Sequence, residues 1–318
     1  MKLLNRFPLF LPLLVLLAIL ASPLLRAQTL MIGTGVAGNS YDVMMGQALG
    51  RCNANGEVGA QNTTGTLQNI DYTIGNKQEL GIGQEDALFL RKTSDANVNK
   101  LMTLFSLHPE EIHVVAPINS GLFQKKSTLG FERQGDPVVF TGVEQLAGFT
   151  VAAGGGSYDT ARLIASNTGI GFNVLKAKDN ADALRLVKEG KAQAVLAVAG
   201  APSGWVSDLP AGQYKMLSFK QATIERLVAI YSGAQVSYDN LGAEGVKTVS
   251  TNAVLFTRQF TDPKMIDALA RLRRCLQDAV PVLQNTRNTH PKWQDVNPNA
   301  KSKWPWYDLP VAGAATRR

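Results

Sequence analysis

Apolar and polar positions follow one another in this chain in a pattern that predicts alternating strands and helices. Short apolar runs, typical of buried strands, lie near 29–33, 57–61 and 79–83, and segments with helical spacing lie near 40–53 and 66–75. This alternation is typical of a parallel sheet covered by helices. The first part of the chain is therefore expected to form one α/β lobe.

The same order of elements is predicted a second time, about 115 residues further along the chain. A glycine-rich turn and the triplet Ser-Tyr-Asp open the first helix of each copy, at 40–42 and at 157–159. Glycines that can end the second helix of each copy, Gly75 and Gly190, keep nearly the same separation. Two matches in the same order predict a second lobe of like topology. Its strands and helices are expected near 149–153, 157–168, 171–175, 179–189 and 193–198.

The last third of the chain is predicted to return to the first lobe. An apolar strand near 253–257 precedes Thr261-Asp262-Pro263, a typical helix start, and an amphipathic helix follows over 265–283. This helix carries Cys275, and the first helix of the chain carries Cys52. If the two cysteines form a disulfide, the two helices lie side by side; two separate buried thiols are the alternative.

A chain that returns to its first lobe crosses between the lobes twice, and two crossing segments make a hinge. The candidate crossings are 114–117 and 231–238. The predicted organisation is a signal peptide at 1–27, lobe I at 28–116 plus 236–300, lobe II at 117–235, and a C-terminal tail at 301–318.

The N-terminus has the pattern of a secretory signal peptide. Lys2 and Arg6 precede an apolar run over 8–20, and a small residue, Ala27, stands at the expected cleavage point. A membrane anchor is the alternative, although the run contains prolines and is short for crossing a bilayer. We expect cleavage after Ala27 and export to the bacterial periplasm, an oxidising compartment in which cysteines can pair.

Composition narrows the possible functions. The chain has 318 residues, enough for two domains, with 45% hydrophobic and 18% charged residues. The net charge is +7, but lysines and arginines are dispersed without a basic stripe, so no nucleic-acid partner is expected. Three scattered histidines and two distant cysteines form no metal-binding pattern, and no nucleophile motif is present. We therefore predict a protein that is not an enzyme and holds no metal.

Residues 33–38 read Gly-Thr-Gly-Val-Ala-Gly after a strand, which matches the fingerprint of dinucleotide-binding folds. That fingerprint requires an acidic residue at the end of the second strand to hold the ribose. Here the second strand ends Ala60-Gln61-Asn62, and the better helix start is Ser40, after the third glycine. No cofactor is therefore expected.

Polar residues follow the predicted strands of both copies at their carboxyl ends, where open parallel sheets bind ligands. Glycine-rich turns leave backbone N–H groups free at helix N-termini, which suits an anion such as a carboxylate. A plainer interpretation is that Ser40, Asp42, Ser157 and Asp159 only cap helices. Trp205, after the third strand of the second copy, could cover a ligand or belong to the core. The candidate ligand-binding residues are Thr34, Gly35, Ser40, Tyr41, Asn62, Thr64, Gly65, Thr66, Gln84, Gly155, Gly156, Ser157, Tyr158, Asp159 and Thr160.

The chain resembles the TAXI-class solute receptors of tripartite ATP-independent periplasmic (TRAP) transporters over nearly its whole mature length. The residues that carry the resemblance are Ile32-Gly33-Thr34-Gly35 with Tyr41, Asn62-Thr63-Thr64-Gly65-Thr66, Leu80-Gly81-Ile82-Gly83-Gln84 with Asp86, Gly154-Gly155-Gly156-Ser157, and the segments Thr248-Val249-Ser250 through Thr257-Arg258. The resemblance implies a two-lobed type II periplasmic binding protein fold with two crossover hinge segments. It also implies a membrane permease as partner, and a small carboxylate such as glutamate or 2-oxoglutarate as ligand.

Two features depart from that family. Tyr158-Asp159 stands where the family more often has Gly-Thr, and 122–139 resembles an insertion. An added acid near the site leaves a zwitterionic or uncharged ligand open. The leading hypothesis is a periplasmic receptor for an organic acid or amino acid. An orphan periplasmic sensor and a secreted enzyme are the alternatives.

Overall fold

The protein is described here by a computed structural model that covers residues 30–53, 55–128 and 131–309. The predicted signal peptide at 1–27 lies outside these ranges. Within them, no helix combines the length and the apolar character needed to cross a membrane.

The first lobe has the predicted order of elements, because its apolar runs form buried strands and its amphipathic segments form the helices between them. The strands β1, β2 and β3 pair in parallel with β1 in the middle. The elements are β1 (Leu30–Gly35), α2 (Ser40–Cys52), β2 (Val58–Asn62), α3 (Thr66–Ile74), β3 (Leu80–Gln84), α4 (Glu85–Lys92) and the 3-10 helix η1 (Ala96–Lys100).

The second copy is confirmed as well, and its strands also pair in parallel. It comprises β7 (Thr150–Gly154), α5 (Ser157–Thr168), β8 (Asn173–Ala177), α6 (Asn180–Lys188) and β9 (Ala194–Ala199). The second lobe is completed by η2 (Val143–Leu146), α7 (Gly204–Ser207), β10 (Tyr214–Met216), α8 (Gln221–Leu227), β11 (Ser232–Tyr238) and η3 (Asp239–Leu241).

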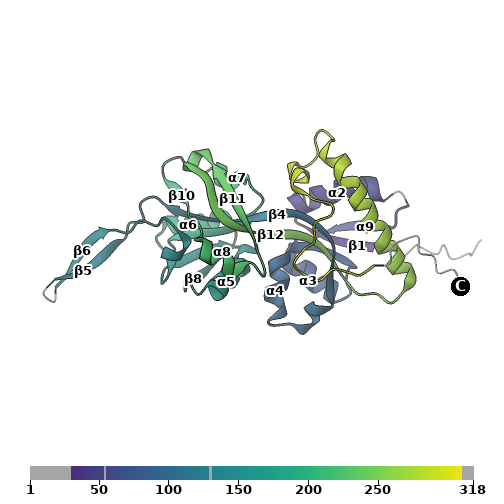
Figure 1. Cartoon of the computed structure of the whole chain (residues 1–318), viewed down its shortest axis with the longest axis horizontal. Helices are drawn as coiled ribbons and strands as arrows, with labels where there is room; N and C mark the ends of the chain where they lie inside the picture. The colour runs from purple at the N-terminus through teal and green to yellow at the C-terminus, as the bar shows by residue number, and fades with distance from the viewer. Residues whose placement is uncertain (1–29, 54, 129–130, 310–318) are drawn as a thin grey trace, which may run out of the picture.

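Two long strands, β4 (Leu101–Pro117) and β12 (Ala243–Arg258), run through both lobes and pair antiparallel along the crossing (Figure 1). They stand at the centre of one sheet with the order β2-β1-β3-β12-β4-β9-β7-β8. Each half of the sheet therefore has its own parallel part, and the two antiparallel strands join the halves. This arrangement confirms the predicted two-lobed type II periplasmic binding fold with two crossovers.

The crossings lie at other residues than those expected. Leu107 packs in the core of the first lobe and Ile112 in that of the second, so β4 crosses near 110. Val249 packs in the core of the second lobe and Ala253 in that of the first, so β12 returns between these two residues. The segment 231–238, which contains β11, pairs with β12 inside the second lobe instead of crossing. A strand that folds back in a hairpin has the same alternation as one that crosses, so the pattern could not separate them. The lobe boundaries expected after 116 and 235 accordingly lie within the second lobe.

The final helix α9 (Pro263–Gln284) packs beside α2, and Cys52 and Cys275 form a disulfide with a Cα–Cα distance of 5.6 Å. The short helix η4 (Pro291–Asp295) follows. Residues 301–309, expected as a tail, pack on the first lobe: Trp304 is buried, and its backbone N–H donates to the carboxylate of Glu85. The expected insertion at 122–139 holds the two-stranded sheet of β5 (Phe123–Thr128) and β6 (Phe131–Pro137), which projects from the second lobe (Figure 1).

The pH dependence of stability can test whether His113 of β4 is buried in the second lobe. Its Nε2 lies 2.7 Å from the hydroxyl of Tyr238, and burial lowers the pKa of His113 from 6.5 to about 4. Between these values the unfolded chain binds more protons than the folded one, so stability falls as the pH falls. Between pH 7 and pH 5 this histidine should remove about 2 kcal/mol from the free energy of unfolding.

The variant His113→Gln has no titrating ring and should lack that part of the pH dependence. Urea unfolding of both proteins at pH 7 and pH 5 measures it as the difference between the two pH slopes. Parallel slopes would show that His113 is not buried as described.

Candidate functional site

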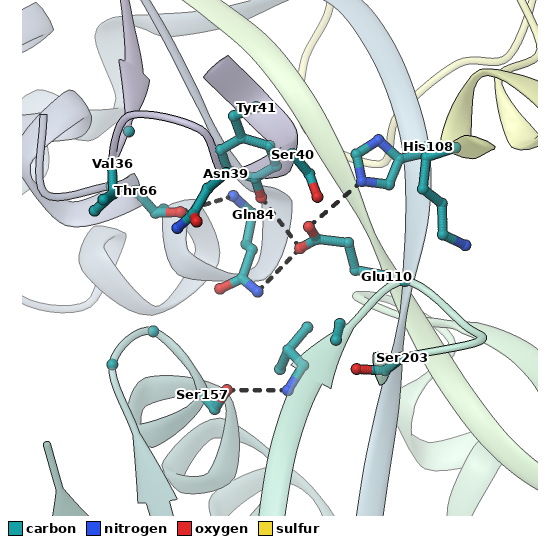
Figure 2. A pocket seen from close by; sticks show the side chains of 18 of the residues that line it. Val36, Asn39, Ser40, Tyr41, Thr66, Gln84, His108, Glu110, Ser157 and Ser203 are labelled. Carbon is teal, nitrogen blue, oxygen red and sulfur yellow. Dashed lines mark hydrogen bonds and ion pairs between the residues drawn. The ribbon is translucent and has the colours of Figure 1, made fainter. Parts of the chain in front are cut away.

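A cleft of about 1020 Å³ lies between the lobes, and both lobes supply its walls (Figure 2). From the first lobe come the turn after β1, the start of α2, the loop before α3 and the segment 290–295. From the second lobe come the turn before α5, the end of β8 and the loop after β9. The crossing strand β4 contributes His108 and Glu110. The glycine-rich turns of the two copies therefore line one and the same cleft.

Many of the residues selected from the sequence meet in this lining: Thr34, Gly35, Ser40, Tyr41, Thr64, Gly65, Thr66, Gln84, Gly155, Gly156 and Ser157. The remaining candidates do not line it. Asn62 donates to the carboxylate of Asp42 at 2.7 Å, and Thr160 donates to Asp86 at 2.6 Å. Asp159 lies 3.7 Å from Arg162, and the ring of Tyr158 faces the ammonium group of Lys176 at 5.5 Å.

Neither Ser40 nor Ser157 caps its helix, so the capping interpretation of these two serines is wrong. α2 begins at Ser40 after Asn39, α5 begins at Ser157 after Gly156, and neither helix start receives a side-chain cap. The hydroxyl of Ser157 instead accepts the N–H of Val198 at 2.9 Å, which ties α5 to β9. The backbone N–H groups at both helix starts therefore have no side-chain acceptor, although at α5 those of Tyr158 and Asp159 donate to the carbonyl oxygens of Gly155 and Gly156.

Asp42, the last residue of the first Ser-Tyr-Asp triplet, stabilises the turn. Its carboxylate accepts the N–H of Gly38 and the hydroxyl of Thr34, both at 3.0 Å, and these bonds lower the pKa of Asp42, the backbone bond most. At the start of this turn a Cβ on Gly33 would lie 2.3 Å from the Asn69 side chain and 2.4 Å from that of Gln78. Gly33 is thus required for close packing of α3 on the sheet, independently of any ligand.

Glu110 stands at the crossing, buried at 7% exposure, and forms the centre of a polar cluster (Figure 2). Its Oε2 accepts the hydroxyl of Tyr41 at 3.1 Å and the amide of Gln84 at 3.0 Å. Its Oε1 lies 3.6 Å from Nε2 of His108. Burial and the charge of Glu110 raise the pKa of Tyr41 well above its ordinary value, so the phenol keeps its proton and donates it.

Sequence reasoning missed this cluster. His108 and Glu110 are two residues apart, so their side chains share one face of β4. Mostly apolar runs lie along the strand on both sides of 108–111, a segment that also holds the charged Glu111. A charged residue within a long apolar strand was the available signal.

The segment 290–295 was also missed, because it lies far along the chain from every other lining residue. Trp293 is buried in the first lobe and anchors η4, with its indole N–H donating to Gln47 at 2.8 Å. Lys292 then reaches the other lobe: its ammonium group donates to the carbonyl of Ala201 and to Asp295, both at 2.6 Å. This contact joins the lobes at one side of the cleft.

The cleft has positive charge on the second lobe and negative charge at its floor. Lys176 and Lys178 are exposed beside the turn that precedes α5, whereas Glu110 is a buried acid. Lys292 and Asp295 of the first lobe also line the cleft and are paired with each other at 2.6 Å. In the residues that the structure describes, no group of three or more His, Cys, Asp or Glu side chains is arranged to hold a metal ion. The arrangement suits a small polar ligand held by hydrogen bonds and charges.

Comparison with known proteins gives one family match. The family model described as the NMT1-like family matches residues 32–289, which includes both lobes and both crossing strands. No match is found among curated proteins.

Several solved structures are similar in overall arrangement at low sequence identity. One is the GluR0 ligand-binding core from Nostoc punctiforme in complex with L-glutamate, with 12% identity, a TM-score of 0.49, and coverage of 84% of this chain and 100% of that one. A second is the substrate-binding protein of an amino acid ABC transporter, with 9% identity, a TM-score of 0.47, and coverage of 80% and 94%. A third is arginine-bound truncated ArgBP from T. maritima, with 13% identity, a TM-score of 0.45, and coverage of 79% and 96%.

Proposed function

Because this chain belongs to the NMT1-like family and its two lobes enclose a cleft lined from both sides, we propose that it is a solute-binding receptor. It captures one small ligand that carries a carboxylate and closes its lobes over that ligand by bending at β4 and β12. The observation that carries the proposal is the meeting of two uncapped helix starts, of α2 and α5, on opposite walls of one cleft.

The two walls offer complementary groups to a carboxylate. The N-terminus of a helix attracts an anion through its free N–H groups and its dipole. Lys176 and Lys178 add positive charge beside the start of α5. Binding to groups on both lobes favours the closed arrangement, since an open form would satisfy only one set of contacts. The ligand-binding role of the lining residues and of the neighbouring Asn62, Tyr158, Asp159 and Thr160 belongs to this proposal.

We place this receptor in the bacterial periplasm, where a membrane permease of the TRAP type takes the ligand from the closed form. The signal-peptide pattern at the N-terminus and the resemblance to TAXI-class receptors support this placement. Purification from the periplasm with and without the first 27 residues tests the export step. Co-purification with a TRAP-type membrane permease tests the transport step, and delivery of the ligand to a sensor kinase instead would contradict it.

A bulky side chain at Thr64 should abolish ligand binding and leave the fold intact. Thr64 is exposed on the first-lobe wall, and its backbone N–H donates to Gln68, a contact that a substitution keeps. A ligand present at 100 times its Kd stabilises the native state by about 2.7 kcal/mol, and Thr64→Trp should lose that stabilisation. Native mass spectrometry of freshly purified protein identifies a retained ligand, and thermal unfolding measures the effect.

Ser94→Trp is the matched control, because Ser94 is exposed on the first lobe outside the cleft. Its ligand-induced stabilisation should equal that of the unaltered protein. Equal stabilisation of the Thr64 variant would remove the cleft from the binding event and with it the proposed function.

A further inference from the structure

We propose that the ligand of this cleft carries a protonated nitrogen, and that Glu110 binds it. The proposal rests on the proposed function and gives it a substrate class: acids with an ammonium or similar cationic nitrogen, in place of acids without one. It follows from the position of Glu110, from the way its two oxygens are used, and from the charges on the opposite wall.

The two carboxylate oxygens of Glu110 have different surroundings. Oε2 accepts two hydrogen bonds, from the hydroxyl of Tyr41 and the amide of Gln84, which occupy its lone pairs. Oε1 accepts no hydrogen bond within the described part of the chain, and the nearest cationic candidate is His108 Nε2 at 3.6 Å. Tyr41 and Gln84 therefore hold the carboxylate in place and leave one oxygen for a further donor.

The free oxygen, Oε1, is important because Glu110 is buried. Glu110 is 7% exposed, and a buried carboxylate is costly unless charged or hydrogen-bonding partners compensate it. Among the residues that the structure describes, the basic side chain within 4.0 Å of it is that of His108, and no lysine or arginine side chain comes that close. The neighbouring Glu111 differs, since it accepts the N–H of Ala201 and lies 3.9 Å from Lys292. Unlike Glu111, Glu110 therefore has a carboxylate oxygen available to a ligand.

The groups at the two ends of the space between the lobes also differ in charge. Glu110 lies at the crossing strands between the wall that carries Tyr41 and Gln84 and the wall that carries Ser157 (Figure 2). Lys176 and the amides at the start of α5 attract an acid on the second lobe, whereas Glu110 repels one at the floor. A molecule with a carboxylate at one end and a protonated nitrogen at the other satisfies both.

This arrangement predicts that the protein distinguishes between ligands that differ only in whether they carry a protonated nitrogen. A hydroxy acid of the same shape can donate one neutral hydrogen bond to Oε1, whereas an ammonium group donates a charge-assisted one. An oxo acid offers only an acceptor, which faces the carboxylate unfavourably. A hydrogen bond to a charged group corresponds to about 10- to 100-fold in affinity, so this preference is measurable.

The experiment uses matched pairs that differ only at that position: L-alanine and L-lactate, L-aspartate and L-malate, and L-phenylalanine and phenyllactate. Thermal unfolding of the full mature protein screens each pair, and isothermal titration gives the Kd of any compound that stabilises it. The amino member of a pair should bind at least about 30-fold more tightly than its hydroxy counterpart. The variant Glu110→Gln should lose that preference, because it keeps the shape of the side chain and removes its charge.

Glu225→Gln is the matched control, since Glu225 is exposed on α8 and contacts Gln221 of the same helix. It should keep the preference. Hydroxy acids that bind as tightly as amino acids to the unaltered protein would overturn this inference and leave the proposed function standing, whatever the folding of the Glu110 variant. Absence of stabilisation by every member of both series would overturn the carboxylate proposal and this inference together.

Discussion

Reduction of the disulfide between Cys52 and Cys275 is expected to lower the free energy of unfolding by about 4–5 kcal/mol. The bond joins residues separated by 223 positions, so it closes a loop that contains the whole second lobe. A crosslink across so long a loop restricts the unfolded chain strongly, and the native contact between α2 and α9 remains when the bond is broken. Urea unfolding of the protein with and without dithiothreitol measures the difference.

The double variant Cys52→Ser/Cys275→Ser is the control for side effects of the reductant. It should match the reduced protein in stability and show no response to dithiothreitol. Its ligand affinity should be unchanged, because neither sulfur lines the cleft. Equal stability of the oxidised and reduced proteins would contradict the disulfide.

Replacement of Asp86 by alanine is expected to cost about 2–4 kcal/mol of stability, because it leaves two buried hydroxyl groups unsatisfied at a contact between the lobes. Asp86 is the second residue of α4 in the first lobe, and it is 1% exposed. Its Oδ2 accepts the hydroxyl of Thr160 at 2.6 Å and that of Tyr231 at 2.8 Å, both from the second lobe. Alanine would leave two buried hydroxyl groups without their acceptor.

A double-mutant cycle with Thr160→Val measures whether this contact joins the lobes. The losses of Asp86→Ala and Thr160→Val should fall short of additivity by at least about 1 kcal/mol, since both remove the same bond. Asp86→Asn keeps an oxygen acceptor and should lose less than the alanine variant. Fully additive effects in urea unfolding would mean that Asp86 and Thr160 act independently.

The prediction of the lobes succeeded because its evidence was local and occurred twice. Strand and helix periodicity, a glycine-rich turn and a glycine at a helix end act within a few residues of one another. These signals located β1 to β3 and β7 to β9 and the helices between them. They also located Ser40 and Ser157 after the carboxyl ends of the parallel strands of each lobe. The parallel strands of the two lobes run in opposite directions in the sheet, so these ends face each other across one cleft.

The residues at the floor of the cleft could not be predicted from local sequence patterns. Glu110 lines the cleft because β4 continues through both lobes, and the pairing of β4 with β12 decides where β4 crosses. Lys292 reaches Ala201 because Trp293 is anchored in the core of the first lobe. These positions depend on contacts between segments far apart in the chain, and no local pattern records them.

By itself the sequence determined the two α/β lobes, the order of their elements and the identity of the turns that line the cleft. The tertiary structure alone decided that Cys52 meets Cys275, where the chain crosses, and which acid lies at the crossing. The physical reason is the range of the interactions involved. Backbone propensity and side-chain periodicity act between near neighbours, whereas strand pairing across the hinge and burial of a charge are settled only when distant segments pack.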